Sequence, residues 1–231
     1  MWEIISSSLP QLLAAGFKYT IPLALISFFF GLIIALITAL IRLAHQDGAF
    51  MILKWIAQFY VWLFRSTPLL VQLFIVFFGL PYLRIKGILP HGIKLQPFTA
   101  GIITFSLNTG AYASETIRAA ISSVPNGQWE AGEAIGMTRL QILWRIIIPQ
   151  ALQVALPPLS NSFISLVKDT SLAASITILE MFEVSQQIAA ENYQPLLMYT
   201  LVAIIYAVFT TVLSTLQHYL EKKLGSRVTI S

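Results

Sequence analysis

The sequence predicts an all-α membrane protein with about five transmembrane helices and one cytoplasmic helix–turn–helix loop. Three observations support this class: the composition, the length of the apolar runs, and a polar segment set between two of them. Of the 231 residues, 57% are hydrophobic and only 10% are charged, whereas about 25% are charged in an ordinary soluble domain. Because a soluble protein needs charge to cover its surface, we expect residues 1–231 to form a single transmembrane domain.

Five apolar runs are long enough to cross the bilayer core, which requires about 20 residues. In chain order they are residues 21–41, 55–83, 95–114, 146–167 and 195–217. The second run is interrupted only by Arg65. The fourth contains Pro157 and Pro158, which remove two backbone donors and predict a broken helix. Residues 170–179 are too short to span, so we expect a buried or re-entrant segment there.

An odd number of spans puts the two termini on opposite sides of the membrane. With the C-terminus inside, eight basic residues are cytoplasmic and four are outside, in agreement with the positive-inside rule. The cytoplasmic set is Arg42, Lys54, Arg118, Arg139, Arg145, Lys222, Lys223 and Arg227, and the outer set is Lys18, Arg84, Lys86 and Lys94. The first run is also too long for the apolar core of a signal peptide, so we expect it to remain as a span.

The composition excludes several other classes of protein. With no cysteine, disulfides and thiolate metal sites are excluded, and the three histidines (His45, His91 and His218) are too widely spaced to form a metal cluster. The net charge of +4 is explained by basic cytoplasmic loops rather than by nucleic-acid binding. No nucleophile elbow and no histidine inside a predicted span is present, which argues against an intramembrane enzyme.

Residues 126–149, which include the sequence QWEAGEAIGMTRLQILWRIIIP, form the polar segment between the third and fourth runs. Asn126 is predicted to cap a first helix that has Glu130 in its first turn. Gly136 is predicted to end that helix in a left-handed conformation. Thr138 and Gln141 then form a capping box that begins a second helix.

Each of these two helices has a surface that could contact another protein or the lipid. The first carries small residues at Ala131, Gly132 and Ala134, where a groove of another protein can approach closely. The second has one apolar face, which is expected to comprise Leu140, Leu143, Trp144 and Ile147. An amphipathic hairpin that rests on lipid is equally compatible with this pattern.

The order of residues in this segment resembles the docking loop of ABC importer permeases. That loop has the pattern E-A-A, three residues, Gly, nine residues, and then I-x-L-P. Gly132 replaces the third alanine and Ile148 the leucine; Gly132 is expected to loosen the first helix by about 1 kcal/mol relative to alanine. The residues that the resemblance assigns to ATPase coupling are Glu130, Ala131, Glu133, Ala134, Gly136, Ile146 and Pro149.

Three further blocks extend the resemblance over essentially the whole chain. They are FRSTPLLVQLFIVFFGLP (64–81), SLNTGAYASETIRAAI (106–121) and LPPLSNSFISLVKDTSLA (156–173). These blocks resemble polar amino-acid permeases, and among those the chain is most similar to the L-cystine permeases. Sister permeases for glutamine, arginine, histidine or glutamate share most of the blocks, so these solutes stay as alternatives.

The resemblance implies a type I ABC importer permease of the bacterial inner membrane, which is not an enzyme. Such a subunit pairs with itself or with a sister permease, sits on two ATP-hydrolysing subunits, and receives solute from an extracytoplasmic amino-acid-binding protein. It needs no cofactor or metal of its own, because the partners use the ATP. The chain agrees, since it lacks a G-x-x-x-x-G-K-[ST] phosphate loop. A channel or an ion-driven transporter would need its own gate and often an inverted repeat, and no repeat is visible.

Polar residues in three spans are predicted to lie at similar depth. Arg65 comes eleven residues after Lys54, which corresponds to about 16 Å along a helix, and Asn108 and Asn161 lie at comparable depths in their spans. Arginine can hold a carboxylate with two hydrogen bonds. The candidate substrate path is therefore Arg65, Thr67, Gln72, Asn108, Asn161, Ser162 and Ser165. Hydrogen bonds between helices are the alternative explanation.

Three charged residues near the ends of spans are candidates for a gate. Lys168 and Asp169 end the fourth run, where Lys168 either reaches the outer interface or contributes to an outer gate. Glu115 lies near the inner end of the third run. Its position three residues before Arg118 predicts an ion pair within the helix, and a gating role is the alternative.

Overall fold

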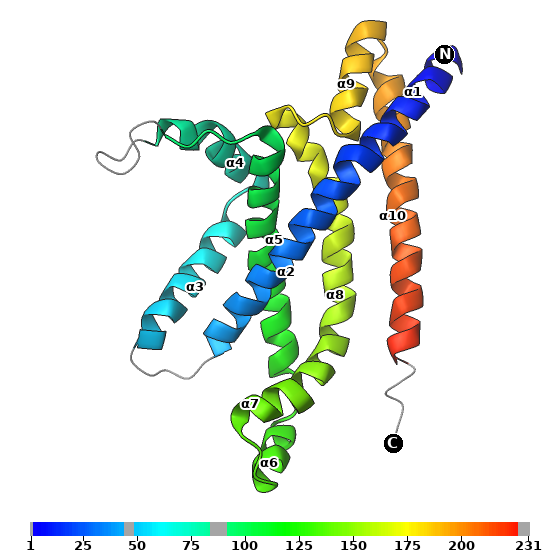
Figure 1. Cartoon of the computed structure of the whole chain (residues 1–231). Helices are drawn as coiled ribbons and strands as arrows, with labels where there is room; N and C mark the ends of the chain where they lie inside the picture. Colours follow the sequence, from blue (N-terminus) through cyan, green and yellow to red (C-terminus); the bar gives the residue numbers. More distant parts are fainter. Residues whose placement is uncertain (1, 44–48, 84–91, 226–231) are drawn as a thin grey trace.

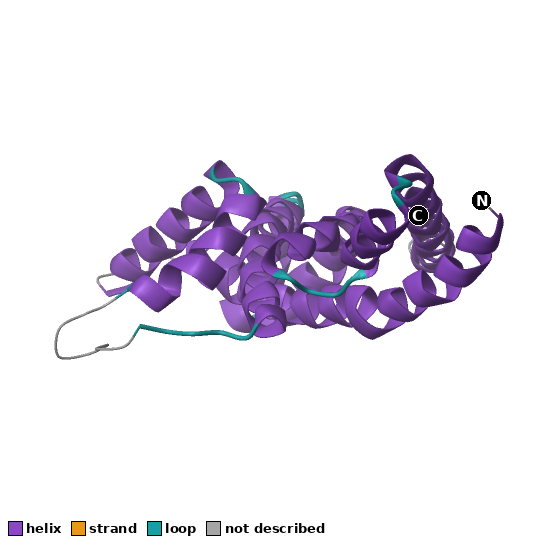
Figure 2. Cartoon of the chain, turned by 90° about the horizontal axis from the view of Figure 1, so that it is seen from above, coloured by secondary structure: helices purple, strands orange, loops and turns teal. Residues whose placement is uncertain are grey.

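The computed structural model describes residues 2–43, 49–83 and 92–225, and over these ranges it contains helices and loops but no strand (Figures 1 and 2). By length and composition, three helices are suited to cross a membrane, or four if one bent pair is a single span. The expectations for His45, Arg84, Lys86, His91 and Arg227 fall outside the described residues.

The first span is longer than predicted. Helices α1 (Trp2–Ala15) and α2 (Ile21–Leu43) are joined by a turn of π-helix, η1 (Gly16–Thr20), into one helical stretch of 42 residues. At about 1.5 Å per residue this stretch is about 60 Å long, twice the thickness of the bilayer core. Its first part therefore extends beyond the span, and Leu12 and Ala15 pack there with residues of α9 and α10 (Figure 1).

The second predicted span, 55–83, is not straight. Helix α3 (Ala49–Ser66) meets α4 (Leu69–Phe74) at an angle of 110°, and α4 continues through η2 (Ile75–Gly79) and η3 (Leu80–Tyr82). The cause is Pro68, which is extended at ψ 137° and disfavours a helical conformation of Thr67. The apolar run gave no sign of this break because hydropathy does not register backbone geometry.

Helix α5 (Pro97–Ser122) runs through the middle of the molecule, in contact with α2, α3 and α8 (Figure 1). It corresponds to the third predicted span, and its 26 residues measure about 39 Å. It is not among the helices apolar enough to count as spans. The reason is that small and hydroxylated side chains, such as Thr104, Ser106 and Ser114, are buried against neighbouring helices.

The predicted break at Pro157 and Pro158 is wrong. Helices α6 (Asn126–Ala134) and α7 (Arg139–Ile142) form the hairpin, and η4 (Leu143–Ile147) then leads directly into α8 (Ile148–Asp169). Residues Arg139–Ile176 form one helical stretch of 38 residues. Prolines are tolerated inside a membrane helix, and α8 continues through both of them. Beside them, Ser162 donates a hydrogen bond to the Pro158 carbonyl (2.9 Å), and Gln217 of α10 donates one to the Pro157 carbonyl (3.4 Å).

The last third of the chain turns back along α8. The short helix η5 (Thr170–Ile176) buries Thr170, Ala173 and Ile176, as expected for a segment that does not span. It is followed by α9 (Met181–Asn192) and the long α10 (Pro195–Gly225). The start of α1 and the end of α10 lie at opposite ends of the molecule (Figure 1). This arrangement is compatible with termini on opposite sides of a membrane, and the N-outside orientation stays a prediction.

Glu180 is a fully buried carboxylate that joins α9 to α10. It caps α9 by accepting hydrogen bonds from the Phe182 N–H (2.8 Å) and the Glu183 N–H (2.7 Å). It also accepts one from the Tyr206 hydroxyl (2.7 Å). Burial raises the pKa of Glu180 to about 7, although these hydrogen bonds favour the charged form. The contact between α9 and α10 thus contains a group that titrates near neutral pH.

We expect Glu180→Gln to flatten the pH dependence of stability. A carboxyl whose pKa is raised in the folded state stabilises fully below its ordinary pKa, and this contribution is lost as pH rises through about 7. The wild-type melting temperature in detergent should therefore fall from about pH 5 to about pH 8 more steeply than that of Glu180→Gln. Glu191→Gln, an exposed change in the same helix, should follow the wild type. Identical slopes for wild type and Glu180→Gln would contradict this role.

Candidate functional site

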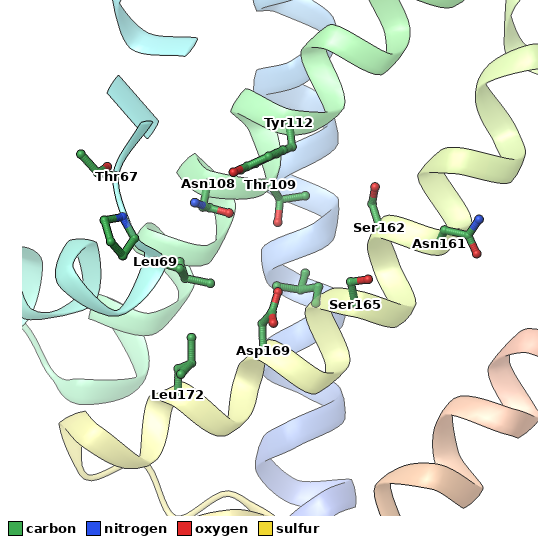
Figure 3. A pocket seen from close by; sticks show the side chains of 12 residues that line it. Thr67, Leu69, Asn108, Thr109, Tyr112, Asn161, Ser162, Ser165, Asp169 and Leu172 are labelled. Carbon is green, nitrogen blue, oxygen red and sulfur yellow. The ribbon is translucent and has the colours of Figure 1, made fainter. Parts of the chain in front are cut away.

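A cavity of about 490 Å³ lies between α5, α8 and the bend that joins α3 to α4 (Figure 3). We call it the amide cavity, because two asparagines lie in its wall. Its polar lining residues are Thr67, Asn108, Thr109, Tyr112, Asn161, Ser162, Ser165 and Asp169. Five of the seven predicted path residues are among them. Thr109, Tyr112 and Asp169 were not predicted to line the path.

Gln72, another predicted path residue, does not line the amide cavity but supports its wall. Its side chain is 6% exposed, and its amide donates hydrogen bonds to the Phe64 carbonyl (2.9 Å) and the Thr67 carbonyl (3.0 Å). These bonds satisfy carbonyls that the bend at Pro68 leaves without helical partners. The Gln72 oxygen in turn accepts a hydrogen bond from the Asn108 amide at 3.0 Å. Gln72 therefore fixes both the bend and the orientation of Asn108.

The polar residues of α8 line the cavity from the other side. Figure 3 shows Ser165 and Asp169 on the side of α8 that faces α5, and Asn161 on the side towards α10. Asn161 accepts a hydrogen bond from the Gln217 amide at 3.2 Å, so it also links α8 to α10. Asn108 and Asn161 thus line the same cavity, and their role in a substrate path stays a prediction.

Glu115 gathers three arginines at a second site. Its carboxylate oxygens lie 2.6 Å from Nη1 of Arg42 and 2.9 Å from Nε of Arg118. Nη1 of Arg65 is more distant, at 3.6 Å. The predicted pair with Arg118 is confirmed. Arg42 was not predicted as a partner, because it is 73 residues away in sequence and no local pattern reports such a contact.

A second cavity, of about 440 Å³, lies beside this cluster. We call it the arginine cavity, and its lining residues are Arg42, Gln58, Val61, Trp62, Arg65, Ser66, Tyr112 and Glu115. Arg65 thus lies in a different cavity from the two asparagines. Its guanidinium is 5.5 Å from the centre of the Tyr112 ring. Three arginines and one carboxylate leave a formal surplus of two positive charges, which favours binding of an anion.

The candidate gate residues lie in three separate surroundings. Asp169 lines the amide cavity and Glu115 the arginine cavity. Lys168 instead faces a groove formed with Phe182 of α9 and Tyr199 of α10. Adjacent positions on a helix point in different directions, so Lys168 and Asp169 do not share a cavity. A gating role for these residues stays a prediction.

The hairpin of α6 and α7 has the predicted turn but not the predicted first cap. Gly136 is left-handed (φ +79°), and the capping box is present, with hydrogen bonds of 2.9 Å and 3.4 Å between Thr138 and Gln141. Pro125 rather than Asn126 occupies the N-cap, so the prediction for Asn126 is wrong. With Pro125 as the N-cap, the helix begins at Asn126, one residue earlier than expected, and Glu130 then falls beyond its first turn.

The structure shows why residue 132 is a glycine and not the alanine of the family pattern. A Cβ atom at Gly132 would lie 2.6 Å from Cγ1 of the buried Ile142. The small residue therefore admits a side chain of α7, and we expect no gain from an alanine there. The apolar face of the second helix agrees with prediction only in part: Ile147 is buried as expected, whereas Leu140 and Trp144 are exposed. Ile142, which was not predicted, is buried instead.

The chain belongs to the family of binding-protein-dependent transport system inner membrane components, whose model matches residues 48–226. It is 49% identical, over 98% of its length and 92% of the relative, to the L-cystine transport system permease protein TcyB of Bacillus subtilis (strain 168). It is 35% identical, over 97% of its length and 99% of the relative, to a putative glutamine transport system permease protein GlnP of Rickettsia bellii (strain RML369-C). The resemblance to ABC importer permeases is thereby confirmed.

Solved structures agree with this assignment. A crystal structure of an amino acid ABC transporter with histidines matches with a TM-score of 0.78 and 31% identity, over 88% of this chain and 90% of the other. The inward-facing MetNI methionine ABC transporter matches with a TM-score of 0.75 over 94% of this chain and 97% of the other. At 21% identity, the second match supports the fold alone.

We expect Glu115→Gln to destabilise the protein more than Arg118→Gln does. Removing Glu115 leaves three guanidinium groups without their shared counter-charge, and a hydrogen bond to a charged group contributes about 1.5–3 kcal/mol. Arg118 forms a partly exposed pair within one helix, which contributes roughly 0.3–0.5 kcal/mol. Thermal unfolding of the purified variants measures the difference. Equal losses of stability for both variants would show that Glu115 does not organise the cluster.

Proposed function

We propose that the chain is the permease subunit of a bacterial ABC importer that moves a polar amino acid, L-cystine, across the inner membrane. The observation that carries this proposal is the pair of polar cavities inside a chain that is 57% hydrophobic. A zwitterion needs hydrogen-bonding partners wherever it leaves water. The identity of 49% to a permease named for L-cystine transport supports the choice of solute.

The chemistry of each cavity suits a charged group of an amino acid. In the amide cavity, Asp169 can accept hydrogen bonds from an ammonium group, and Asn108, Ser162 and Ser165 supply neutral donors and acceptors beside it. In the arginine cavity, Arg65 can donate two hydrogen bonds to a carboxylate. Asn108 donates to Gln72, and its oxygen has no partner within the described part of the chain, so it is available to a ligand.

In this proposal the hairpin of α6 and α7 is the part of the chain that contacts the ATPase subunits. Glu130, Ala131, Glu133 and Ala134 are exposed there, as a surface for an ATPase subunit requires. Two such subunits would press on the hairpin as they close on ATP. Because Arg139–Ile176 is one helical stretch, this movement would be transmitted to Ser162, Ser165 and Asp169 in the cavity wall.

Two further partners belong to this proposal, because this chain would supply only part of the path and would not capture the solute itself. We propose that a second permease subunit completes the path and that an extracytoplasmic binding protein delivers the amino acid. In this orientation the N-terminus is outside and the hairpin is cytoplasmic. Glu115 would then close the inner side of the path and Asp169 its outer side. Glutamine is the alternative solute, which the 35% identity to a putative glutamine permease supports.

The assembly with its ATPase and binding-protein partners should take up labelled L-cystine into proteoliposomes only when ATP is supplied. Unlabelled cystine should compete for uptake, whereas glutamine and arginine should compete weakly. Strong competition by glutamine would change the solute but keep the mechanism. Uptake by the permease alone, without ATPase subunits, would contradict the mechanism itself.

We expect Gly136→Val to uncouple ATP hydrolysis from uptake. A β-branched residue at φ +79° costs about 1–3 kcal/mol and would distort the turn between α6 and α7. Gly127→Val is the matched control, because a side chain also meets nothing within 4 Å there and the position is helical. Gly136→Val should lower the uptake per ATP hydrolysed, whereas Gly127→Val should not. An unchanged ratio for Gly136→Val would rule out this turn as a coupling element.

A further inference from the structure

The amide and arginine cavities are neighbours. Tyr112 lines both of them. The bend between α3 and α4 also contributes to both, since Ser66 lines the arginine cavity and Thr67 the amide cavity. The Tyr112 hydroxyl lies 3.5 Å from the Arg65 carbonyl, which keeps the ring at the boundary. Only the Tyr112 side chain therefore lies between a ligand in one cavity and the other cavity.

The separation of the two cavities can be measured along α5. Asn108 lines the amide cavity, Tyr112 the boundary and Glu115 the arginine cavity. Glu115 comes seven positions after Asn108, which corresponds to about 10 Å along the helix axis. The charges at the two ends differ as well, because Asp169 belongs to the amide cavity, whereas the surplus arginines belong to the other.

A simple amino acid is too short to use both cavities through its charged groups. Its carboxylate and its ammonium are attached to the same carbon atom, so both charges occupy one place. An amino acid with two such heads is different. In a disulfide the two Cα atoms lie about 4.4–6.8 Å apart, and each carboxylate extends further outwards. Cystine therefore has a length comparable to the separation of the cavities.

We propose that the permease recognises a two-headed amino acid across both cavities at once. Arg65 holds the carboxylate of one head in the arginine cavity, and Asn108 and Asp169 bind the other head in the amide cavity. The apolar middle of the molecule lies against Tyr112. This binding mode rests on the proposed function and adds to it the residue that selects for the second head.

Arg65 is the arginine best suited to this task. Glu115 already holds Arg42 at 2.6 Å and Arg118 at 2.9 Å, whereas Arg65 is at 3.6 Å. The Arg65 side chain is also 44% exposed, compared with 14% for Arg42. A guanidinium has five N–H donors in a planar fork, so Arg65 can bind a carboxylate with two bonds without first breaking a strong pair.

Tyr112 suits the middle of the ligand. Its ring is exposed and packs against the Arg65 guanidinium at 5.5 Å. Sulfur makes favourable contacts with aromatic rings of about 0.3–1.5 kcal/mol. A disulfide or thioether at this point would therefore be held between the two polar ends, and an aliphatic link of the same length would be tolerated.

The test is equilibrium binding to the permease in complex with its ATPase subunits, without the binding protein. The binding protein has a selectivity of its own, and leaving it out isolates the permease. The probes are labelled L-cystine, cystathionine, which has two heads and a thioether, and S-methylcysteine, which has one head and a similar sulfur. We expect both two-headed probes to bind at least about 10-fold more tightly than S-methylcysteine, because charge-assisted hydrogen bonds at the second head contribute about 1.5–3 kcal/mol.

Arg65→Gln should abolish this preference. It should weaken the binding of cystine and cystathionine about 10- to 100-fold and leave that of S-methylcysteine nearly unchanged. Arg118→Gln is the matched control, because Arg118 also pairs with Glu115 but lines neither cavity; it should keep the preference. Arg65→Lys retains the charge and should give an intermediate preference, which guards against a folding defect in Arg65→Gln.

Two results would overturn the two-headed mode. One is an equal loss of affinity for one-headed and two-headed probes in Arg65→Gln. The other is a wild-type complex that binds S-methylcysteine as tightly as cystine. ATP-driven uptake of amino acids would then still support the proposed function. Failure of the complete assembly to take up any amino acid would instead remove the proposed function.

Discussion

The close packing of α2 on α5 is the contact on which the rest of the structure depends. A Cβ atom at Gly31 would lie 2.9 Å from Thr109, and one at Gly110 would lie 2.8 Å from Ile34. In a membrane, helices associate through such close approach rather than through a hydrophobic force. The Tyr60 hydroxyl donates to the Leu107 carbonyl at 2.6 Å and holds α3 at the same place. Helix α5 is thereby fixed at the centre, and it contributes Asn108 and Thr109 to one cavity, Glu115 to the other and Tyr112 to both.

The two cavities depend on polar groups that satisfy one another before any ligand arrives. Gln72 bonds the carbonyls released by the bend at Pro68 and also orients Asn108. Glu115 shares its charge among three arginines. Each arrangement leaves groups to spare: the Asn108 oxygen in one cavity and the Arg65 guanidinium in the other. The polar groups inside this apolar chain therefore bond one another, and each cavity keeps hydrogen-bonding groups that are not fully used.

Local signals in the sequence predicted local structure well. The left-handed turn at Gly136, the capping box of Thr138 and Gln141 and the pair of Glu115 with Arg118 each depend on residues within a few positions of one another, and all three are present. Contacts between residues far apart in the sequence were missed: Arg42 bonds Glu115 from 73 positions away. The errors at the prolines had another source, because hydropathy registers neither the continuation of α8 through Pro157 and Pro158 nor the 110° bend at Pro68.

The sequence by itself determined that this chain is a membrane protein, which family it belongs to, and which polar residues stand inside its apolar runs. Composition and motif spacing are properties of the chain alone and do not depend on how its helices pack. Only the tertiary structure decided which of these residues meet. It put Asn108 and Asn161 in one cavity, Arg65 in the next, and Lys168 in a separate groove. The reason is physical: depth along a helix follows from residue number, whereas the direction of a side chain and its partner depend on how the helices pack.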